Sequence, residues 1–204
     1  MDQEIIIKIG YYMKAKYVNK RIGFCFDFDD TLVKTKAKVQ VYKDNKYVTS
    51  LNPNQYSVFI NSKRSKGDYT FDFVEFNDPY FVERATPIKM FYRLRNINNE
   101  INSGNTKYEL FVLTARSLIM RNAIFNFLKN NGINNIKEHN IFTIGDDKGN
   151  IDIAEEKRKI LERIANSFQE VYFYDDDPNN IIMAKDIYGL RAKLVEGYIN
   201  KIKF

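Results

Sequence analysis

The sequence has very few of the residues that form disulfides and histidine-based metal sites. Its 204 residues include one cysteine, one histidine and no tryptophan. Cys25 alone cannot form an internal disulfide, and His139 alone cannot form a histidine-rich metal site. We expect Cys25 to be a small buried residue in a cytoplasmic protein without a disulfide partner.

Long hydrophobic runs are also missing. No run approaches the roughly 20 apolar residues that cross a membrane, so no membrane partner is expected. The first eight residues begin with acidic side chains and include Lys8, which is not typical of a secretory signal. The sequence contains no phosphate-binding Gly-x-x-x-x-Gly-Lys loop, and an EF-hand starting at Asp27 would lack its glycine and its glutamate.

Hydrophobic residues make up 44% of the chain, which is enough for the core of one domain. The net charge is +6, and a basic surface attracts phosphate-bearing molecules, nucleic acid included. The alternative is a compositional bias, because Lys, Asn, Ile, Tyr and Phe all have AT-rich codons. Neither the substrate nor the oligomeric state follows from these numbers.

Short apolar strands alternate with helices along most of the chain. The residues at 3–18 fit a helix or a strand equally well. Strands are expected at 22–26, 108–113, 140–144, 171–174 and 191–195, and helices from Thr86 to Gly104, around 119–128 and over 152–168. This alternation predicts an α/β fold with a Rossmann-like, mostly parallel sheet covered by helices on both faces.

The residues after the first strand predict a small insertion within a single domain spanning 1–204. Residues 38–42 and 46–49 flank a turn, which favours a hairpin. Residues 50–85 look irregular, with turns at 51–53 and 66–68, so 36–85 is interpreted as a flap hairpin with a small cap-like insertion. The alternating aromatic residues of 69–76 indicate either a small local core or a surface that stacks bases.

Acidic or hydroxyl side chains follow three of the expected strands. Asp27 and Asp29 are two residues apart and project to the same side of an extended chain, where their charges repel. Thr114 and Asp175-Asp176 follow two later strands, and the carboxyl ends of parallel strands share one edge of the sheet. A Mg²⁺ ion with a substrate phosphate would offset the repulsion; a solvated acidic turn is the alternative.

Lys157 is expected to be the cation of this site. On the helix over 152–168 it lies within about 60° of the apolar residues that form the buried stripe. Lys159 is the second candidate. A lysine whose stem runs along the core towards water is the alternative interpretation.

These segments resemble the four motifs of the haloacid dehalogenase-like (HAD) phosphohydrolases. Asp27-Phe28-Asp29-Asp30-Thr31 is similar to the first motif, and an apolar strand ending at Thr114 is similar to the second. Lys157 stands in the place of the third-motif lysine, and the strand ending at Asp175-Asp176 is similar to the fourth. The order and spacing agree over about residues 20–195. The insertion bears a fainter resemblance to HAD-type hydrolases of tailed bacteriophages, which would place the protein in a host cytoplasm.

The resemblance implies a role for each motif residue. Asp27 would be the nucleophile that forms an aspartyl-phosphate, and Asp29 the general acid and base. Mg²⁺ would be held by the Asp27 carboxylate, the Asp29 backbone carbonyl and Asp176, with Asp175 and Asn180 as supporting candidates. Thr114 and Lys157 would bind the phosphoryl oxygens. Arg116 could contact substrate, or could equally pair with a surface acid.

The expected function is therefore a Mg²⁺-dependent phosphatase acting on a phosphomonoester, such as a nucleotide, another small phosphorylated molecule or a nucleic-acid end. The alternatives are a phosphoryl transferase and a non-catalytic protein that binds phosphate or nucleotide on the same fold.

Overall fold

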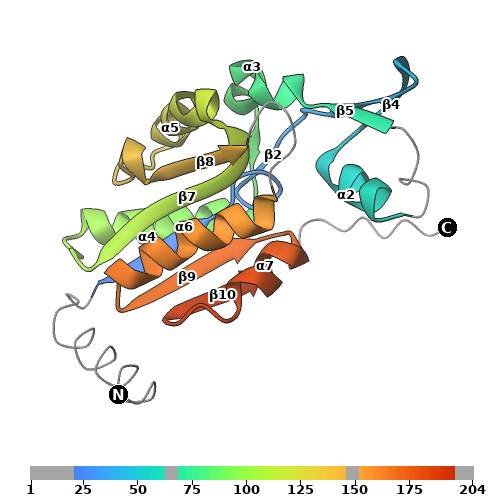
Figure 1. Cartoon of the computed structure of the whole chain (residues 1–204). Helices are drawn as coiled ribbons and strands as arrows, with labels where there is room; N and C mark the ends of the chain where they lie inside the picture. The colour runs from blue at the N-terminus through green and yellow to red at the C-terminus, as the bar shows by residue number, and fades with distance from the viewer. Residues whose placement is uncertain (1–20, 63–68, 146–151, 196–204) are drawn as a thin grey trace, which may run out of the picture.

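The computed structural model describes residues 21–62, 69–145 and 152–195 (Figure 1). The prediction for residues 3–18 and the predicted turn at 66–68 lie outside these residues. Among the described residues, no helix has both the length and the apolar character needed to cross a membrane.

The centre of the molecule is a five-stranded parallel sheet in the order β10-β9-β1-β7-β8. Its strands are β1 (Ile22–Phe26), β7 (Tyr108–Ser117), β8 (Ile141–Gly145), β9 (Glu170–Asp175) and β10 (Leu190–Leu194). Every pairing within it is parallel. All five carboxyl ends therefore lie at one edge, and the predicted α/β fold with a parallel sheet is confirmed.

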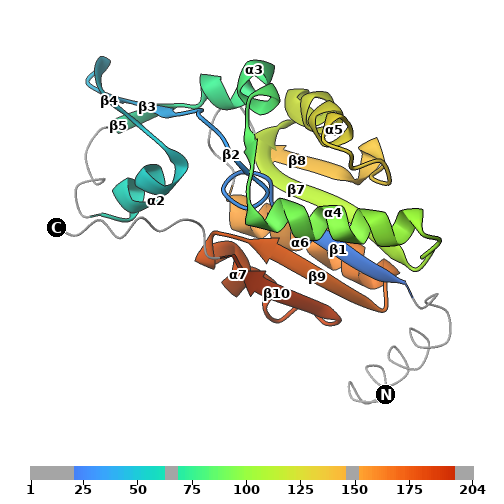
Figure 2. The ribbon, with the colours of Figure 1, turned by 180° about the vertical axis from the view of Figure 1, so that it is seen from behind.

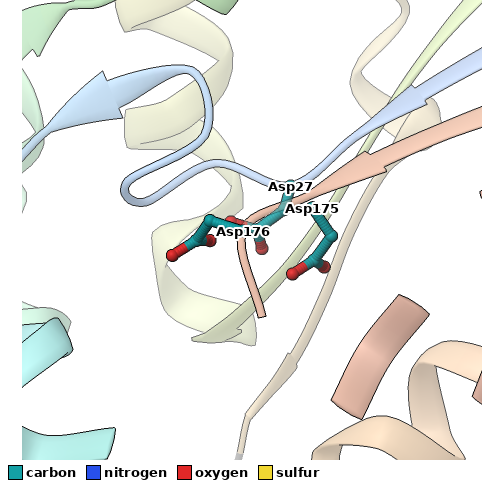
Figure 3. A group of neighbouring side chains, drawn as sticks. All are labelled: Asp27, Asp175 and Asp176. Atoms are coloured by element: carbon teal, nitrogen blue, oxygen red, sulfur yellow. The ribbon is translucent and has the colours of Figure 1, made fainter. Parts of the chain in front are cut away.

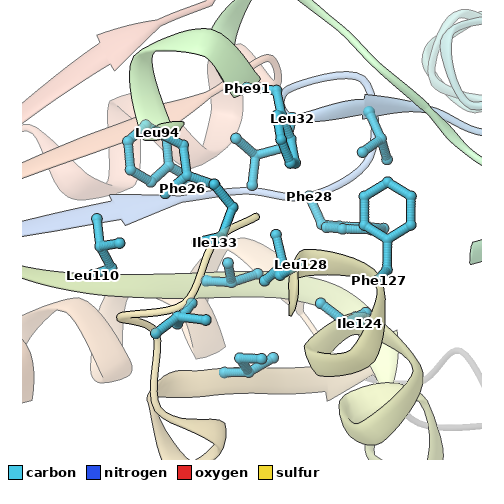
Figure 4. Close-up of a cluster of buried hydrophobic side chains, with 14 of the residues drawn as sticks. Phe26, Phe28, Leu32, Phe91, Leu94, Leu110, Ile124, Phe127, Leu128 and Ile133 are labelled. Carbon is cyan, nitrogen blue, oxygen red and sulfur yellow. The ribbon is translucent and has the colours of Figure 1, made fainter. Parts of the chain in front are cut away.

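Helices cover both faces of this sheet, as expected. The helices α4 (Lys89–Asn102) and α5 (Arg121–Asn130) pack on one face, and α6 (Ile153–Ser167) and α7 (Pro178–Ala184) on the other (Figures 1 and 2). Side chains of β1 alternate between two cores: Phe24 and Phe26 pack with α4 and α5, and Cys25 packs with α6. Figure 4 shows the first core, where Phe26 lies near Phe91 and Leu94 of α4. Cys25 is fully buried, as predicted.

The predicted start of α4 at Thr86 is wrong. Thr86–Pro87 forms a two-residue strand, β6, which pairs antiparallel with β2 (Val33–Lys34). Ile88 then donates its backbone N–H to the carbonyl of Leu32 at 3.0 Å, so the helix begins only at Lys89. A threonine-proline pair suits a helix start, but tertiary pairing to the chain that leaves the first strand overrides that local preference.

The insertion between β2 and β6 is more regular than predicted. It contains the antiparallel strands β3 (Val39–Lys43), β4 (Lys46–Leu51) and β5 (Tyr69–Asp72), the helices α2 (Pro53–Asn61) and α3 (Pro79–Glu83), and the 3₁₀ helix η2 (Val74–Asn77). The predicted hairpin is present, with positive φ at Asp44 and Asn45 in its turn. Figure 2 shows β3, β4, β5 and α2 beyond the arrowheads of the parallel strands.

The predicted turn at 51–53 is in fact the start of α2. Asn52 caps this helix, because its side chain accepts a hydrogen bond from the Gln55 N–H, and the Gln55 side chain accepts one from the Asn52 N–H. This reciprocal capping box was visible as the Asn-Pro-x-Gln spacing.

The aromatic residues of the insertion form the small local core that was one of the two interpretations. Tyr56 of α2 contacts Phe71 and Phe73 with ring centroids 5.2 and 5.3 Å apart. Phe59, one turn later, contacts Tyr69 at 5.2 Å. These rings pack against one another and hold α2 on the three-stranded sheet, so their contacts lie within the insertion itself.

Candidate active site

The site is built on the first residue after β1. Asp27 is 6% exposed, and its N–H donates to the carbonyl of Tyr174 at 2.9 Å, which continues the parallel hydrogen bonding with β9. This bond places Asp27 beside Asp175, the last residue of β9. Carboxylate oxygens of Asp27, Asp175 and Asp176 lie within 4.8 Å of one another (Figure 3). The expected convergence of the two strand ends is therefore observed.

Lys157 reaches this cluster from α6. Its side chain is 3% exposed, and its Nζ lies 2.7 Å from Asp27 Oδ1 and 2.7 Å from Asp175 Oδ2. Burial alone would lower the pKa of Lys157, but the carboxylates of Asp175 and Asp27 outweigh it and raise the pKa. Lys159, the second candidate, does not reach the site: it is 55% exposed and pairs with Glu156.

Asp175 and Asp176 differ in the donors that surround them. Asp175 is 1% exposed, and its two oxygens accept hydrogen bonds from Lys157 Nζ, Asn180 Nδ2 and the Asp177 N–H. Asp176 Oδ1 accepts a longer bond, 3.2 Å, from Thr31 Oγ1. Asp176 is thus the better placed of the two to bind a metal directly, while Asp175 orients Lys157.

The electrostatics of the cluster fit a divalent cation. Burial raises the pKa of Asp176 to about 7, and the charges of Asp175 and Asp30 act in the same direction. Burial also raises the pKa of Asp27 well above its usual value, with Lys157 opposing this and Asp175 adding to it. One lysine therefore does not compensate three neighbouring carboxyl groups. Carboxylate oxygens are the hard ligands that Mg²⁺ prefers, so this donor set fits the ion that the sequence motifs imply.

Asp29 lies apart from this cluster and pairs with Arg116. Arg116 Nε donates to Asp29 Oδ2 and Arg116 Nη2 to Asp29 Oδ1, both at 2.8 Å. Of the two alternatives for Arg116, substrate contact or pairing with a surface acid, the structure shows an ion pair, but with the candidate acid and base itself. The two residues are 87 positions apart in sequence, so no local pattern could have revealed the pair.

Thr114 is at the predicted place, but β7 does not end there. The strand runs on to Ser117, with a register shift against β8 between Thr114 and Ser117. Thr114 is 1% exposed, and its Oγ1 accepts a hydrogen bond from the Arg116 N–H at 3.3 Å. The irregular stretch packs closely on β8, since a Cβ on Gly145 would lie 2.0 Å from the Ala115 carbonyl oxygen.

The turn after Asp29 contains two side-chain contacts beside the acidic cluster that sequence reasoning missed. Asp30 has a φ of 58°, in the left-handed region where glycine is favoured, and its Oδ1 accepts a hydrogen bond from Lys34 Nζ at 2.6 Å. Thr31 is fully buried and donates to Asp176. The spacing of four residues between Asp30 and Lys34 was a usable signal for the first contact. The second joins residues 145 positions apart.

Comparison with known proteins gives similarity to solved HAD domains. The HAD domain of the effector protein Lem4 from Legionella pneumophila is 14% identical, with a TM-score of 0.42 and coverage of 90% of this chain and 91% of that one. Its inactive mutant is 13% identical, with a TM-score of 0.46 and coverage of 90% and 89%. A HAD-family enzyme from Bacteroides thetaiotaomicron, a magnesium complex, is 10% identical, with a TM-score of 0.42 and coverage of 89% and 96%.

Likenesses of this size carry no argument about activity. No protein-family model and no curated protein matches the sequence. The chain itself has a parallel sheet with β1 at its centre, and the residues of the four motifs lie at or beside the carboxyl ends of its strands. In these respects the chain has the α/β fold with a parallel sheet that its sequence predicts.

Proposed function

We propose that this protein is a Mg²⁺-dependent HAD-type phosphatase that cleaves phosphomonoesters through a phosphorylated Asp27. One observation supports this most strongly: Asp27 lies among Asp175, Asp176 and Lys157, with carboxylate oxygens within 4.8 Å of one another and Lys157 Nζ 2.7 Å from Asp27. A nucleophilic carboxylate, a metal-binding carboxylate and a buried cation thus meet at one strand end, which is the set that phosphoryl transfer requires.

Asp27 is arranged to attack with one oxygen while the other is held. Lys157 binds Oδ1, and in the described parts of the chain no hydrogen bond reaches Oδ2. An Asp27 oxygen attacks phosphorus, and the bond between phosphorus and the ester oxygen breaks, its electron pair leaving with that oxygen. Asp29 gives its proton to the departing oxygen.

The second displacement regenerates the enzyme. A water molecule attacks phosphorus and gives a proton to Asp29, while the bond between Asp27 and phosphorus breaks. Asp27 returns to a carboxylate and inorganic phosphate is released. Thr114 and Lys157 bind the phosphoryl oxygens during both displacements, which keeps phosphorus in line with the attacking group.

Mg²⁺ would be held by the carboxylates of Asp27 and Asp176 and by the backbone carbonyl of Asp29. When bound, the ion neutralises the charge that the phosphoryl group brings into this acidic cluster. Thr31 and Asn180 hold the carboxylates of Asp176 and Asp175 in place for it.

The proposed substrate is a nucleotide or a nucleic-acid end. The net charge of +6 favours association with polyanions. The strands β4 and β5 and the helix α2 of the insertion lie beyond the carboxyl ends of the parallel strands, where a cap that recognises the leaving group would be placed. Activity on a polymer end should fall steeply with salt, because binding then depends on released counterions. Activity on a small nucleotide should depend on salt only weakly.

The test is phosphate release by the wild type and by Asp27→Asn, with and without Mg²⁺. The substrates are p-nitrophenyl phosphate, a panel of nucleotides, and oligonucleotides phosphorylated at the 3′ or the 5′ end. We expect Mg²⁺-dependent release that Asp27→Asn abolishes. The matched control is Asp186→Asn, which also removes one acidic charge but at an exposed position. Undiminished turnover by Asp27→Asn rejects the mechanism, and transfer of the phosphoryl group to an acceptor other than water identifies a transferase.

A further inference from the structure

Arg116 is a buried cation that joins three parts of the chain. It is 3% exposed, and it donates from Nε and Nη2 to the two oxygens of Asp29, each at 2.8 Å. Its Nη1 donates to the backbone carbonyl of Phe76 at 2.7 Å. Asp29 lies in the turn after β1, Arg116 in β7 and Phe76 in η2 of the insertion. The guanidinium therefore connects the candidate acid and base with the insertion.

The contact with Asp29 is compatible with proton transfer. A guanidinium that donates two parallel hydrogen bonds fixes both the position and the plane of a carboxyl group. Each carboxyl oxygen has two lone pairs, and Arg116 uses one on each. Asp29 can therefore exchange a proton with a substrate or with water while Arg116 continues to hold it in one orientation.

The contact with Phe76 links the position of the insertion to that of the Arg116–Asp29 ion pair. Besides the carbonyl bond, the Arg116 guanidinium lies 5.2 Å from the Phe76 ring centroid, and Ser117 Oγ donates to Asn77 Oδ1 at 2.7 Å. Glu75 joins η2 to β3 of the insertion, because its carboxylate accepts bonds from the Lys38 N–H at 2.8 Å and from Gln40 Nε2 at 2.7 Å. A continuous series of hydrogen bonds thus runs from the insertion sheet through η2 and Arg116 to Asp29.

We propose that Arg116 is the positioning residue of Asp29. Because Arg116 also binds the carbonyl of Phe76, we propose that the orientation of Asp29 for proton transfer depends on the position of the insertion relative to β7. The proposal rests on the proposed phosphatase function. It assigns the insertion a part in catalysis besides covering the site. A substrate whose leaving group contacts the insertion would fix the position of η2, and through it the positions of Arg116 and Asp29.

The test compares phenyl phosphate with p-nitrophenyl phosphate in the variants Arg116→Lys and Asp29→Asn. The two substrates have nearly the same shape, but phenoxide is a basic leaving group, like the tyrosine side chain with its pKa of about 10, and needs a proton that nitrophenoxide does not. The measured quantity is kcat/KM, which reports the steps up to departure of the leaving group. Arg116→Lys keeps the positive charge and loses the paired donors.

We expect Arg116→Lys to lower kcat/KM for phenyl phosphate by roughly 10- to 100-fold, which is less than most of the contribution of about 10²–10⁴ that a general acid–base group makes, because Asp29 itself remains. The kcat/KM for p-nitrophenyl phosphate should change only a few-fold. In an Asp29→Asn background the Arg116 substitution should have little further effect. The role of Arg116 is overturned if Arg116→Lys lowers kcat/KM equally for both substrates. It is also overturned if the loss of kcat/KM caused by Arg116→Lys adds in full to that of Asp29→Asn. Either result leaves the phosphatase proposal standing. A wild type that releases no phosphate from either substrate overturns both.

The coupling to the insertion is tested at Glu75, which lies outside the acidic cluster. Glu75→Ala removes the bonds from η2 to β3, and should lower kcat/KM for phenyl phosphate several-fold more than for p-nitrophenyl phosphate. Arg84→Ala is the control, because Arg84 belongs to the same insertion and its guanidinium lies over Tyr80 at 4.1 Å. Thermal unfolding of each variant checks that it is folded. A Glu75→Ala variant that is folded and indistinguishable from Arg84→Ala refutes the coupling.

Discussion

Replacing Lys157 by methionine tests whether the cation of the site is held as the structure shows. Methionine keeps the approximate length of the side chain and removes the charge that lies 2.7 Å from both Asp27 and Asp175. Breaking a buried ion pair costs about 3–5 kcal/mol, because the remaining charge is left buried and unpaired. Asp175 keeps its bonds from Asn180 and the Asp177 N–H, so most of this cost should arise at Asp27.

The expected loss is a large part of a total stability of about 5–15 kcal/mol. For a chain of this size each kcal/mol corresponds to about 2–4 °C, so the midpoint of thermal unfolding should fall by roughly 6–20 °C. The assay is thermal unfolding of metal-free protein at pH 8 and at pH 5. Lys157 lowers the pKa of Asp27, so the folded variant without it binds a proton at Asp27 more readily than the folded wild type. The loss of stability in Lys157→Met relative to the wild type should therefore become smaller as the pH falls.

Lys159→Met is the matched control, since Lys159 lies two residues away on the same helix and is exposed. It should leave the midpoint unchanged at both pH values. A Lys157→Met protein with the stability of the wild type at pH 8 would refute the reasoning, because the three clustered carboxyl groups would then need no lysine among them. A difference in midpoint between Lys157→Met and the wild type that is the same at pH 8 and pH 5 would contradict the electrostatic explanation. The loss of stability would then be explained by lost packing alone.

Three further predictions concern the metal site, the strand beside it and the insertion. Because the pKa of Asp176 is raised to about 7 and that of Asp27 is raised as well, the metal-free protein should lose stability as the pH rises from 4 to 7. Asp176→Asn should weaken this dependence, leaving the part due to Asp27, and should be the more stable protein at pH 8. It should also abolish the stabilisation by Mg²⁺ that thermal unfolding measures in the wild type. Gly145→Ala should destabilise the fold by about 1–3 kcal/mol and lower phosphatase activity, because the new Cβ would lie 2.0 Å from the Ala115 carbonyl oxygen and force β7 to shift beside Thr114 and Arg116. Urea unfolding together with kcat/KM checks this prediction. A variant with unchanged stability and activity would contradict the close packing of β7 on β8. Asn52→Ala should cost about 1 kcal/mol through loss of the α2 cap, seen as faster hydrogen exchange in residues 53–61, with no change in exchange in the parallel sheet.

Much of the fold could be predicted because local patterns and burial agree in the parallel sheet. Phe24, Cys25 and Phe26 are buried on alternating faces, as an apolar run between two helical layers requires. The position of Lys157 within an apolar helical stripe predicted a buried cation, which is what the structure shows. The acids after β1 and β9 meet because parallel strands bring their carboxyl ends to one edge.

The predictions that were wrong depended on pairings between distant residues. Thr86 has the chemistry of a helix cap, but pairing with Lys34 draws it into a strand. The apolar run predicts a strand end at Thr114, whereas β7 runs on to Ser117 beside β8. The Arg116–Asp29 ion pair could not be predicted, because the two carboxyl oxygens and the guanidinium are brought together only by the complete fold.

The short pairing of β2 with β6 brings the two ends of the insertion next to each other, with Lys34 opposite Thr86. Chain can therefore be added to or removed from this segment without altering the order of the five parallel strands. Of the insertion, α3 is bound to the main body, since Val82 packs into the core beside α5. The outer strands and α2 form a unit that a homologous loop could replace. Under the proposed function, this segment is the place where an engineer would change substrate preference while leaving Asp27 and its neighbours in place.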